Sequence, residues 1–392
     1  MIKAKVSIER IIIVFAVLMF IGNLLVKLSM FYFDGSFNRI NGYIKLFFEA
    51  IFVFFIVKNF KFSKIVLYPL GLITVMFIGQ LISGVSLANI ITSYSNGNLY
   101  ILNSLIYVFI FICAVKFSKV NQNVYLSIIK VLEKALLINS FFIIIGAILS
   151  IEFFRTYGLS GRFGYNGFFA KNGEVSYLYM ILIIFYYYRY IFMKQTSLFF
   201  GILIVASSIL IGKKVMFLFL FLLLIFHFSF VHKRKFFFRI LLLVLVPIFT
   251  VFSSKIIALI LNVSNFWRTV YEQYGLMGAI TSTRSQILEG TINFIEQKWK
   301  FLNYAFGGID FLKYRVEFEF VDLFLFLGVV GLLIYLYFLK THIFSKNNKL
   351  LNSLVLIFLL CSSFSGGLFI SVTCMIMLYS LIQELKNLKN VN

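Results

Sequence analysis

The sequence predicts an all-α protein, a polytopic membrane bundle of about twelve transmembrane helices. Composition points the same way, because 61% of the 392 residues are hydrophobic and 19% are aromatic. An average soluble domain has roughly 45–50% apolar residues. Apolar runs of about 18 residues or more recur along the chain, and short connectors rich in lysine and arginine separate them. We therefore expect a single membrane domain over residues 1–392.

The expected spans follow the apolar runs in chain order. They cover residues 11–28, 43–57, 65–84, 99–115, 126–150, 174–192, 197–212, 215–230, 237–261, 321–339, 350–364 and 368–384. Since a crossing normally needs about 20 residues, the short spans 197–212 and 350–364 could instead be re-entrant or merged. Pro69 and Pro247 lie inside expected spans, where we expect each to kink its helix.

Charge sets the expected orientation. Basic residues gather in alternate connectors, from Lys3, Lys5 and Arg10 at one terminus to Lys386 and Lys389 at the other. Cytoplasmic loops carry an excess of lysine and arginine, so both termini are expected in the cytoplasm. The same bias accounts for the net charge of +22, and nucleic acid is not an expected partner. No small-residue cleavage site follows the basic N-terminus, which predicts an uncleaved first span.

Cysteine and histidine give no sign of a metal site. All three cysteines fall within apolar runs, where they behave as small hydrophobes. The histidines map to the inner side of the membrane or its edge; they are His227, His232 and His342. No metal-ligand spacing is present, so we expect neither a metal nor a cofactor.

The outward connector after the fifth span is rich in glycine and carries Arg155, Arg162 and Lys171. Glycine allows close approach of backbone to a ligand, and the planar guanidinium suits phosphate oxygens. Arg162 is therefore a candidate phosphate ligand. The alternative, favoured for Arg155, is an arginine that snorkels to lipid headgroups.

A tight outward turn carries Lys213 and Lys214, on the side that should be poor in basic residues. Both ammonium groups must lie near the mouth of the bundle. They meet either lipid phosphates or an anionic ligand, and the breach of the charge bias favours the ligand.

The longest outward connector covers residues 262–320 and contains an expected amphipathic helix. Its apolar positions have helical spacing: Ile287, Thr291, Phe294, Ile295 and Trp299. Thr283 and Gln286 form a capping-box pattern at its start. Arg284 falls in the first turn, where the helix dipole and free N–H groups also favour an anion.

Three carboxylates, Glu317, Glu319 and Asp322, precede or enter the span near residue 321. Such groups are costly to bury unless they are paired or functional, and Lys313 or Arg315 could pair with one or two of them. Elsewhere, Lys45 and Glu49 lie four residues apart within one span, and we expect them to neutralise each other.

The order of these features resembles the bacterial O-antigen polymerase and ligase superfamily, Wzy-like polymerases in particular. The similar segments are the glycine-rich loop, the serine-containing span that ends in ASSILIGKKVM, and a long loop with TSTRSQ, AFGGID and EFEFVDLFLFLGVVGLL. The resemblance implies that Arg162, Lys213 or Lys214, and Arg284 bind the diphosphate of a polyprenyl-linked glycan. This chain has lysine where the family often has arginine, and lysine holds phosphate only as a point charge.

Ligases of the superfamily usually carry a histidine before a Gly-x-x-Gly turn. Before Gly328-Val329-Val330-Gly331 this chain has Glu317, Glu319 and Asp322 and no histidine, which favours a polymerase. The resemblance implies glycosyl transfer at the outer face of the bacterial cytoplasmic membrane, with one of these carboxylates accepting the proton of a sugar hydroxyl. Expected partners are the lipid-linked oligosaccharide, the bilayer, a flippase and a chain-length regulator.

Two other classes stay open at this point. A flippase or transporter also has about twelve spans, but its charges should line a path at mid-membrane depth, and these cluster outside. A structural protein of envelope assembly would need no phosphate-binding residues.

Overall fold

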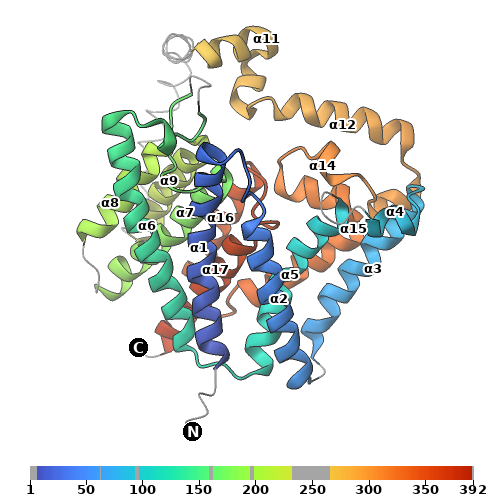
Figure 1. Cartoon of the computed structure of the whole chain (residues 1–392), viewed down its shortest axis with the longest axis horizontal. Helices are drawn as coiled ribbons and strands as arrows, with labels where there is room; N and C mark the ends of the chain where they lie inside the picture. The colour runs from blue at the N-terminus through green and yellow to red at the C-terminus, as the bar shows by residue number, and fades with distance from the viewer. Residues whose placement is uncertain are drawn as a thin grey trace.

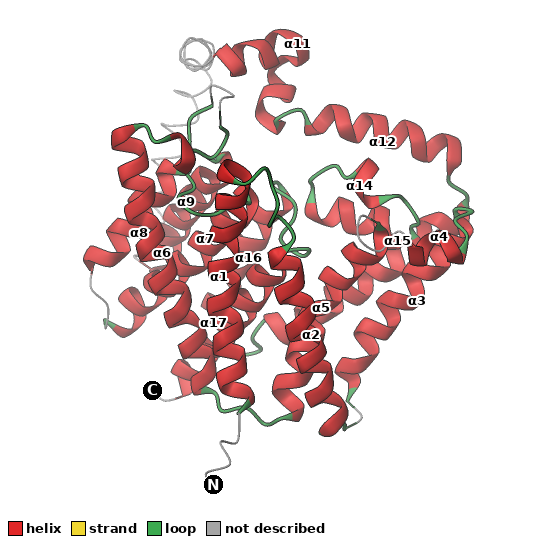
Figure 2. Ribbon diagram, viewed as in Figure 1, coloured by secondary structure: helices red, strands yellow, loops and turns green. Residues whose placement is uncertain are grey.

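The computed structural model describes residues 7–61, 63–92, 97–158, 162–194, 198–231 and 265–390. Every regular element in these ranges is helical (Figure 2), and their one β feature is an isolated bridge between Arg155 and Tyr165. The expected all-α class is therefore confirmed. The expected span 237–261, with Pro247, lies outside the described residues.

Long helices form the body of the described chain (Figure 1). They are α1 (Ile8–Tyr32), α2 (Ile40–Lys58), α3 (Leu67–Ile82), α5 (Asn98–Phe117), α6 (Asn123–Leu149), α7 (Asn172–Tyr188), α8 (Leu198–Leu210), α9 (Lys214–Phe226), α15 (Glu319–Phe338), α16 (Lys349–Ser363) and α17 (Val372–Asn390). Shorter helices or helices outside this body are α4 (Leu87–Thr92), α11 (Asn265–Thr281), α12 (Arg284–Lys298), α13 (Phe301–Phe306) and α14 (Phe311–Tyr314).

Seven of the described helical segments are long and apolar enough to cross a membrane. They are Ile8–Tyr32, Ile40–Lys58, Lys64–Ile82, Asn98–Phe117, Asn123–Leu149, Lys214–Val231 and Glu319–Ile343. The apolar helices α8 and α16 are shorter, and they coincide with the two spans that the sequence marks as short. These helices fit a multi-pass membrane protein, while the count of twelve stays a prediction.

The start of α1 and the end of α17 lie at one end of the bundle, and α12 lies across the opposite end (Figure 1). We call this opposite end the α12 end. Because successive long helices run in alternating directions, the connecting residues 150–158, 162–171, 211–213 and 364–371 also lie there. Residues far apart in sequence thus meet at the α12 end.

The centre of the bundle is built on α7 and α17. Fourteen of the 17 residues of α7 are buried, and α17 packs against α5, α6 and α7. One cluster of buried apolar side chains extends from Ile8 to Leu385. Because these two helices are closely packed on most sides, they support the connectors at the α12 end rigidly.

The α13 segment fastens α12 to the bundle through glycines. Within α15, Gly328 breaks the helix with φ 64°, and a Cβ there would lie 2.3 Å from the carbonyl oxygen of Ala305. The N–H groups of Gly308 and Ile309 donate to the carbonyls of Phe326 and Leu325 at 3.3 and 3.5 Å. The AFGGID segment thus docks on the break in α15, which only glycine permits.

One expected kink is absent. Pro69 lies in the first turn of α3, after a short 3₁₀ turn over Lys64–Val66. In a first turn the N–H that proline lacks would have no intrahelical partner, so the helix continues undisturbed. The prediction of an interior kink at Pro69 is therefore wrong.

Candidate anion-binding site

The glycine-rich loop packs directly on the turn before α9. The N–H of Tyr165 donates to the carbonyl of Leu210 at 2.8 Å. A Cβ at Gly164 would lie 2.4 Å from the carbonyl oxygen of Ile211, and one at Gly212 would lie 2.3 Å from that of Phe163. This backbone contact, possible only for glycine, brings the loop that carries Arg162 beside the turn that carries Lys213.

A buried network of polar side chains from α1 and the start of α7 holds the glycine-rich loop in place. The ammonium of Lys27, 3% exposed on α1, donates to the side-chain oxygen of Asn166 and to the carbonyl of Gly167. Asn166 donates in turn to Asn172 at 2.8 Å, and Asn172 donates to the carbonyl of Thr156 at 2.7 Å. Lys27 thus fastens the glycine-rich loop to α1.

Arg162 and Lys214 lie over aromatic rings. The guanidinium of Arg162 lies 4.0 Å from the ring centre of Tyr157 and 4.9 Å from that of Trp267. The Lys214 ammonium lies 3.5 Å from the ring centre of Trp267 and donates to the carbonyl of Ala279. Cation–π contacts hold both cations beside α11 without neutralising their charge.

The start of α12 differs from its expected form. Thr283 has a left-handed φ of 67°, and its hydroxyl donates to the carbonyl of Ser282 at 2.6 Å. The predicted capping box with Gln286 is therefore wrong, because this backbone turns the threonine away from the helix start. Left-handed backbone at a non-glycine residue is strained, and strain of this kind gathers at functional sites.

Arg284 is held by one carboxylate and by backbone carbonyls. Its Nε and Nη2 donate to the same oxygen of Glu317 at 3.1 and 2.8 Å. Its Nη1 donates to the carbonyl of Phe364 at 3.1 Å, and Nη2 lies 3.5 Å from the carbonyl of Ser365. The Arg284 side chain is 21% exposed and that of Glu317 is 46% exposed, so the pair is open to a ligand.

Lys213 is a half-buried cation among other cations. Burial lowers the pKa of Lys213 to about 8, helped by the charges of Arg284, Arg162 and Arg315 and opposed by that of Glu317. Its ammonium makes no hydrogen bond or ion pair with any described residue. A cation in this position is stabilised when an anion enters.

The two other acidic candidates, Glu319 and Asp322, accept hydrogen bonds from backbone N–H groups. Both carboxylate oxygens of Glu319 accept N–H groups, from Leu368 at 2.8 Å and from Phe369 at 2.5 Å. One oxygen of Asp322 accepts the N–H of Val316 at 2.8 Å, and the other lies 3.7 Å from Nε of Arg315. Both carboxylates are buried, so they fix the chain around the site.

The segment from Phe364 to Phe369 contacts Arg284, Glu317 and Glu319. The charge pattern of the sequence did not predict that this segment belongs to the site. Gly366 has φ 64°, and a Cβ there would lie 2.6 Å from the carbonyl carbon of Glu317. A Cβ at Gly367 would lie 2.7 Å from a terminal nitrogen of Arg315. The buried hydroxyl of Tyr177 donates to the carbonyl of Gly366 at 2.7 Å. The adjacent Gly366 and Gly367, between the last two expected spans, were the sequence signal that could have predicted close backbone packing here.

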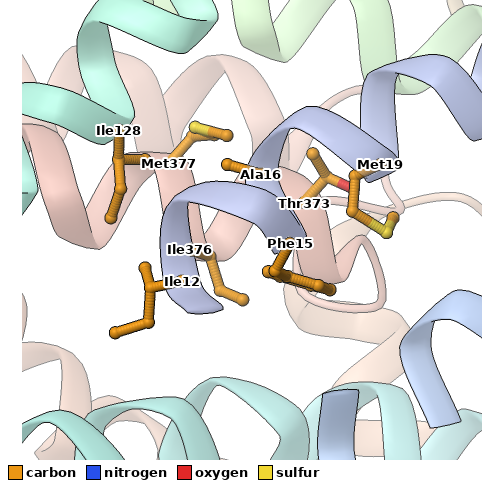
Figure 3. A pocket seen from close by; sticks show the side chains of 8 residues that line it. All are labelled: Ile12, Phe15, Ala16, Met19, Ile128, Thr373, Ile376 and Met377. Atoms are coloured by element: carbon orange, nitrogen blue, oxygen red, sulfur yellow. The ribbon is translucent and has the colours of Figure 1, made fainter. Parts of the chain in front are cut away.

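Two small cavities among the described residues are not lined by any of the four candidate cations. The first is enclosed by α1, α6 and α17 (Figure 3), and Thr373 is the polar member of its lining. The second is lined by Glu319 and Asp322 beneath Gly367. Among the described residues, no group of three His, Cys, Asp or Glu side chains could hold a metal ion.

The structure thus brings Arg162, Lys213, Lys214 and Arg284 together at the α12 end, with Glu317 as their accessible carboxylate. Glu319 and Asp322 are buried, and both accept hydrogen bonds from backbone N–H groups. No family model matches the chain, and no curated protein or solved structure matches it either.

Proposed function

We propose that this protein is a polysaccharide polymerase, which transfers a polyprenyl-diphosphate-linked glycan onto an acceptor repeat unit. The observation that carries the proposal is Lys213, a cation that has no hydrogen-bond or ion-pair partner among the described residues and whose turn packs on the loop that carries Arg162. Glu317 pairs with Arg284 and Asp322 lies near Arg315, which leaves Arg162, Lys213 and Lys214 as excess positive charge, and an entering anion would offset that excess. A diphosphate carries the charge that such a site requires.

The location of the cluster fits a lipid-linked substrate. The cations lie at one end of an apolar bundle, where a diphosphate stays at the membrane surface while its polyprenyl chain remains in the bilayer. We place the α12 end outside the cytoplasm and both termini inside, with about twelve spans in a bacterial cytoplasmic membrane. A flippase would need cations along the whole path, and these gather at one end.

The reaction breaks the bond between the donor's anomeric carbon and its diphosphate oxygen, which leaves with the electron pair. A hydroxyl of the acceptor sugar forms the new carbon–oxygen bond and loses its proton. Arg284, Lys213, Lys214 and Arg162 stabilise the charge that develops on the leaving diphosphate. The acceptor proton goes to Glu317, whose second oxygen makes no hydrogen bond with a described residue and whose side chain is 46% exposed.

Glu319 and Asp322 have positioning roles in this proposal. Glu319 holds the segment that supplies two carbonyls to Arg284. Asp322 holds the backbone before α15, where Glu317 has a strained φ of 65°. Their removal would displace Arg284 and Glu317 without removing a reacting group.

The test uses purified protein in nanodiscs with a polyprenyl-diphosphate-linked repeat unit, and gels resolve the products. We expect long chains from the wild type and a loss of about 10²–10³ in rate for Arg284→Ala. Lys298→Ala is the matched control, because this exposed lysine ends the same helix. Transfer only to a second type of acceptor would indicate a ligase, and movement of substrate across the membrane without new bonds would indicate a flippase.

Orientation is tested separately by cysteine labelling in intact cells. The three native cysteines are buried, which keeps the background low. We expect Lys298→Cys to react with a membrane-impermeant reagent. Labelling only after permeabilisation would overturn the proposed orientation and the mechanism that depends on it.

A further inference from the structure

The end of the bundle opposite the α12 end carries a second pair of cations, from α5 and α17 (Figure 1). The ammonium of Lys116, in the last turn of α5, lies 3.4 Å from Nδ1 of His342. The ammonium of Lys386 on α17 donates to the carbonyls of His342 and Phe344, at 3.3 and 3.2 Å. Two lysines from separate helices thus converge on His342.

Aromatic rings hold His342 in place. Its ring centre lies 5.8 Å from that of Tyr68 on α3 and 5.4 Å from that of Phe338 on α15. Tyr68 is buried, and its hydroxyl lies 3.1 Å from that of Thr341. His342 belongs to a π-helical turn that extends α15 over Leu339–Ile343, and turns of this kind are frequent at functional sites. The imidazole that contacts Lys116 is therefore fixed.

No carboxylate of the described chain forms an ion pair with Lys116 or Lys386. Their acceptors are two carbonyls and a ring nitrogen, which can accept from an ammonium only when it carries no proton. On the neighbouring α2 the expected pairing of Lys45 with Glu49 is absent as well, because Glu49 accepts a hydrogen bond from Asn103 at 2.9 Å. Lys116 is exposed, so its remaining N–H groups are open to an anion.

An exposed apolar surface adjoins these lysines on α3 and α15. The two helices pack against each other, and the ring centres of Tyr68 and Tyr337 lie 6.0 Å apart. Tyr337 is exposed, as are Leu333 on α15 and Leu70 on α3. Both helices belong to segments apolar enough to span a membrane, so this surface would face lipid tails.

We propose that Lys116 and Lys386, positioned by His342, bind the phosphate of an anionic phospholipid whose acyl chains lie on α3 and α15. The phosphate offers charged acceptors to two ammonium groups that have only neutral ones. A free phosphate has the same oxygens but would leave the adjoining apolar surface uncovered, which favours the lipid. The site lies at the other end of the bundle from Arg284, and it does not depend on the proposed function.

Native mass spectrometry of the full chain in detergent tests this site, with phosphatidylglycerol and phosphatidylcholine as probes. We expect the wild type to bind phosphatidylglycerol roughly tenfold more tightly or better. Lys116→Gln and Lys386→Gln should each weaken that binding about fivefold. His342→Phe removes a contact of Lys116 without removing a lysine, and it should also weaken binding. Lys349→Gln is the matched control, because this exposed lysine begins α16 at the same end of the bundle.

Equal binding of the two lipids by the wild type would overturn the site. So would equal losses in Lys116→Gln and Lys349→Gln, because general surface charge would then explain the preference. Thermal unfolding compares inorganic phosphate with phosphatidylglycerol, and equal stabilisation by both would assign the site to free phosphate. Should Lys386→Gln fail to fold, Lys116→Gln changes an exposed residue alone and must still weaken binding, while Lys116→Arg must retain it. None of these results bears on glycosyl transfer at the α12 end.

Discussion

Arg284 donates two hydrogen bonds to one oxygen of Glu317, at 3.1 and 2.8 Å. Carboxylate and phosphate oxygens both fit the fork of a guanidinium, so Glu317 occupies the position that a phosphate would take. In the proposed function, an entering diphosphate would displace Glu317 from Arg284. The displaced carboxylate would then be free to accept the proton of the acceptor hydroxyl.

Glu317→Gln should bind diphosphate more tightly and react more slowly. The neutral amide competes less for Arg284, and a partly exposed ion pair is worth about 0.2–1 kcal/mol, so affinity should rise severalfold at most. Loss of the base should reduce turnover by about 10²–10⁴. Calorimetry with farnesyl diphosphate and a single-turnover transfer assay measure the two effects, with the exposed Glu289→Gln on α12 as control. Weaker binding together with normal turnover would refute both roles of Glu317.

Diphosphate binding should weaken as pH rises through about 8, because Lys213, whose pKa is about 8, loses its charge there. Lys213→Arg should keep its affinity to higher pH, since arginine stays protonated. Titrations of both proteins between pH 7 and pH 9 give the comparison. A wild-type affinity that is flat over this range would show that Lys213 does not bind the anion.

The free energy of unfolding should rise with pH over the range in which diphosphate binding weakens. The folded pKa of Lys213, about 8, lies below its ordinary value of 10.5. The unfolded chain therefore binds more protons between these values, and Lys213 contributes stability as pH rises through that window. Thermal unfolding at each pH separates lost binding from lost structure.

Gly366→Ala should reduce both stability and activity. The φ of 64° is strained for alanine, and the new Cβ would lie 2.6 Å from the carbonyl carbon of Glu317. We expect a loss of about 1–3 kcal/mol and displacement of Glu317. Gly290→Ala is the matched control, because its Cβ would meet nothing within 4 Å and alanine favours the helix. Equal effects of the two substitutions on activity would contradict a specific role for Gly366.

Asn166→Ala should destabilise the protein more than the double variant Lys27→Met/Asn166→Ala. The single change leaves the buried Lys27 ammonium with the carbonyl of Gly167 and costs about 3 kcal/mol. Removing the charge as well recovers part of that loss. Thermal unfolding of the variants measures this coupling, and Asn293→Ala on the exposed side of α12 is the control. A double variant less stable than Asn166→Ala would contradict the network.

Periodic and compositional signals predicted the fold class and the approximate positions of the long described helices, but not the short helices α4, α13 and α14. α12 begins at Arg284, where the pattern predicted a helix, but Ile287 is 43% exposed and only Thr291 and Ile295 of its expected apolar face are buried. Thr283 adopts a left-handed conformation that a capping pattern does not encode. Pro69 marks a helix start, because the 3₁₀ turn before it belongs to the same apolar run.

The candidate cations could be chosen from sequence because charge is conspicuous on a connector that is expected to face outward. The backbone groups that position these cations could not be chosen from sequence. Phe364 and Ser365 act through carbonyl oxygens, and Leu368 and Phe369 act through N–H groups, which every residue has. The distinction between Glu317 and Glu319 likewise depends on backbone packed from 49 residues farther along the chain.

The segment between α16 and α17 also sets the order in which the cation site can form. It follows α1 to α15 along the chain, yet it supplies the backbone groups that hold Arg284 and Glu319. A nascent chain with α1 to α15 already inserted carries every candidate cation but lacks the carbonyl and N–H groups that orient Arg284 and Glu319. The site described here therefore requires that α16 and the segment after it have been synthesised and packed.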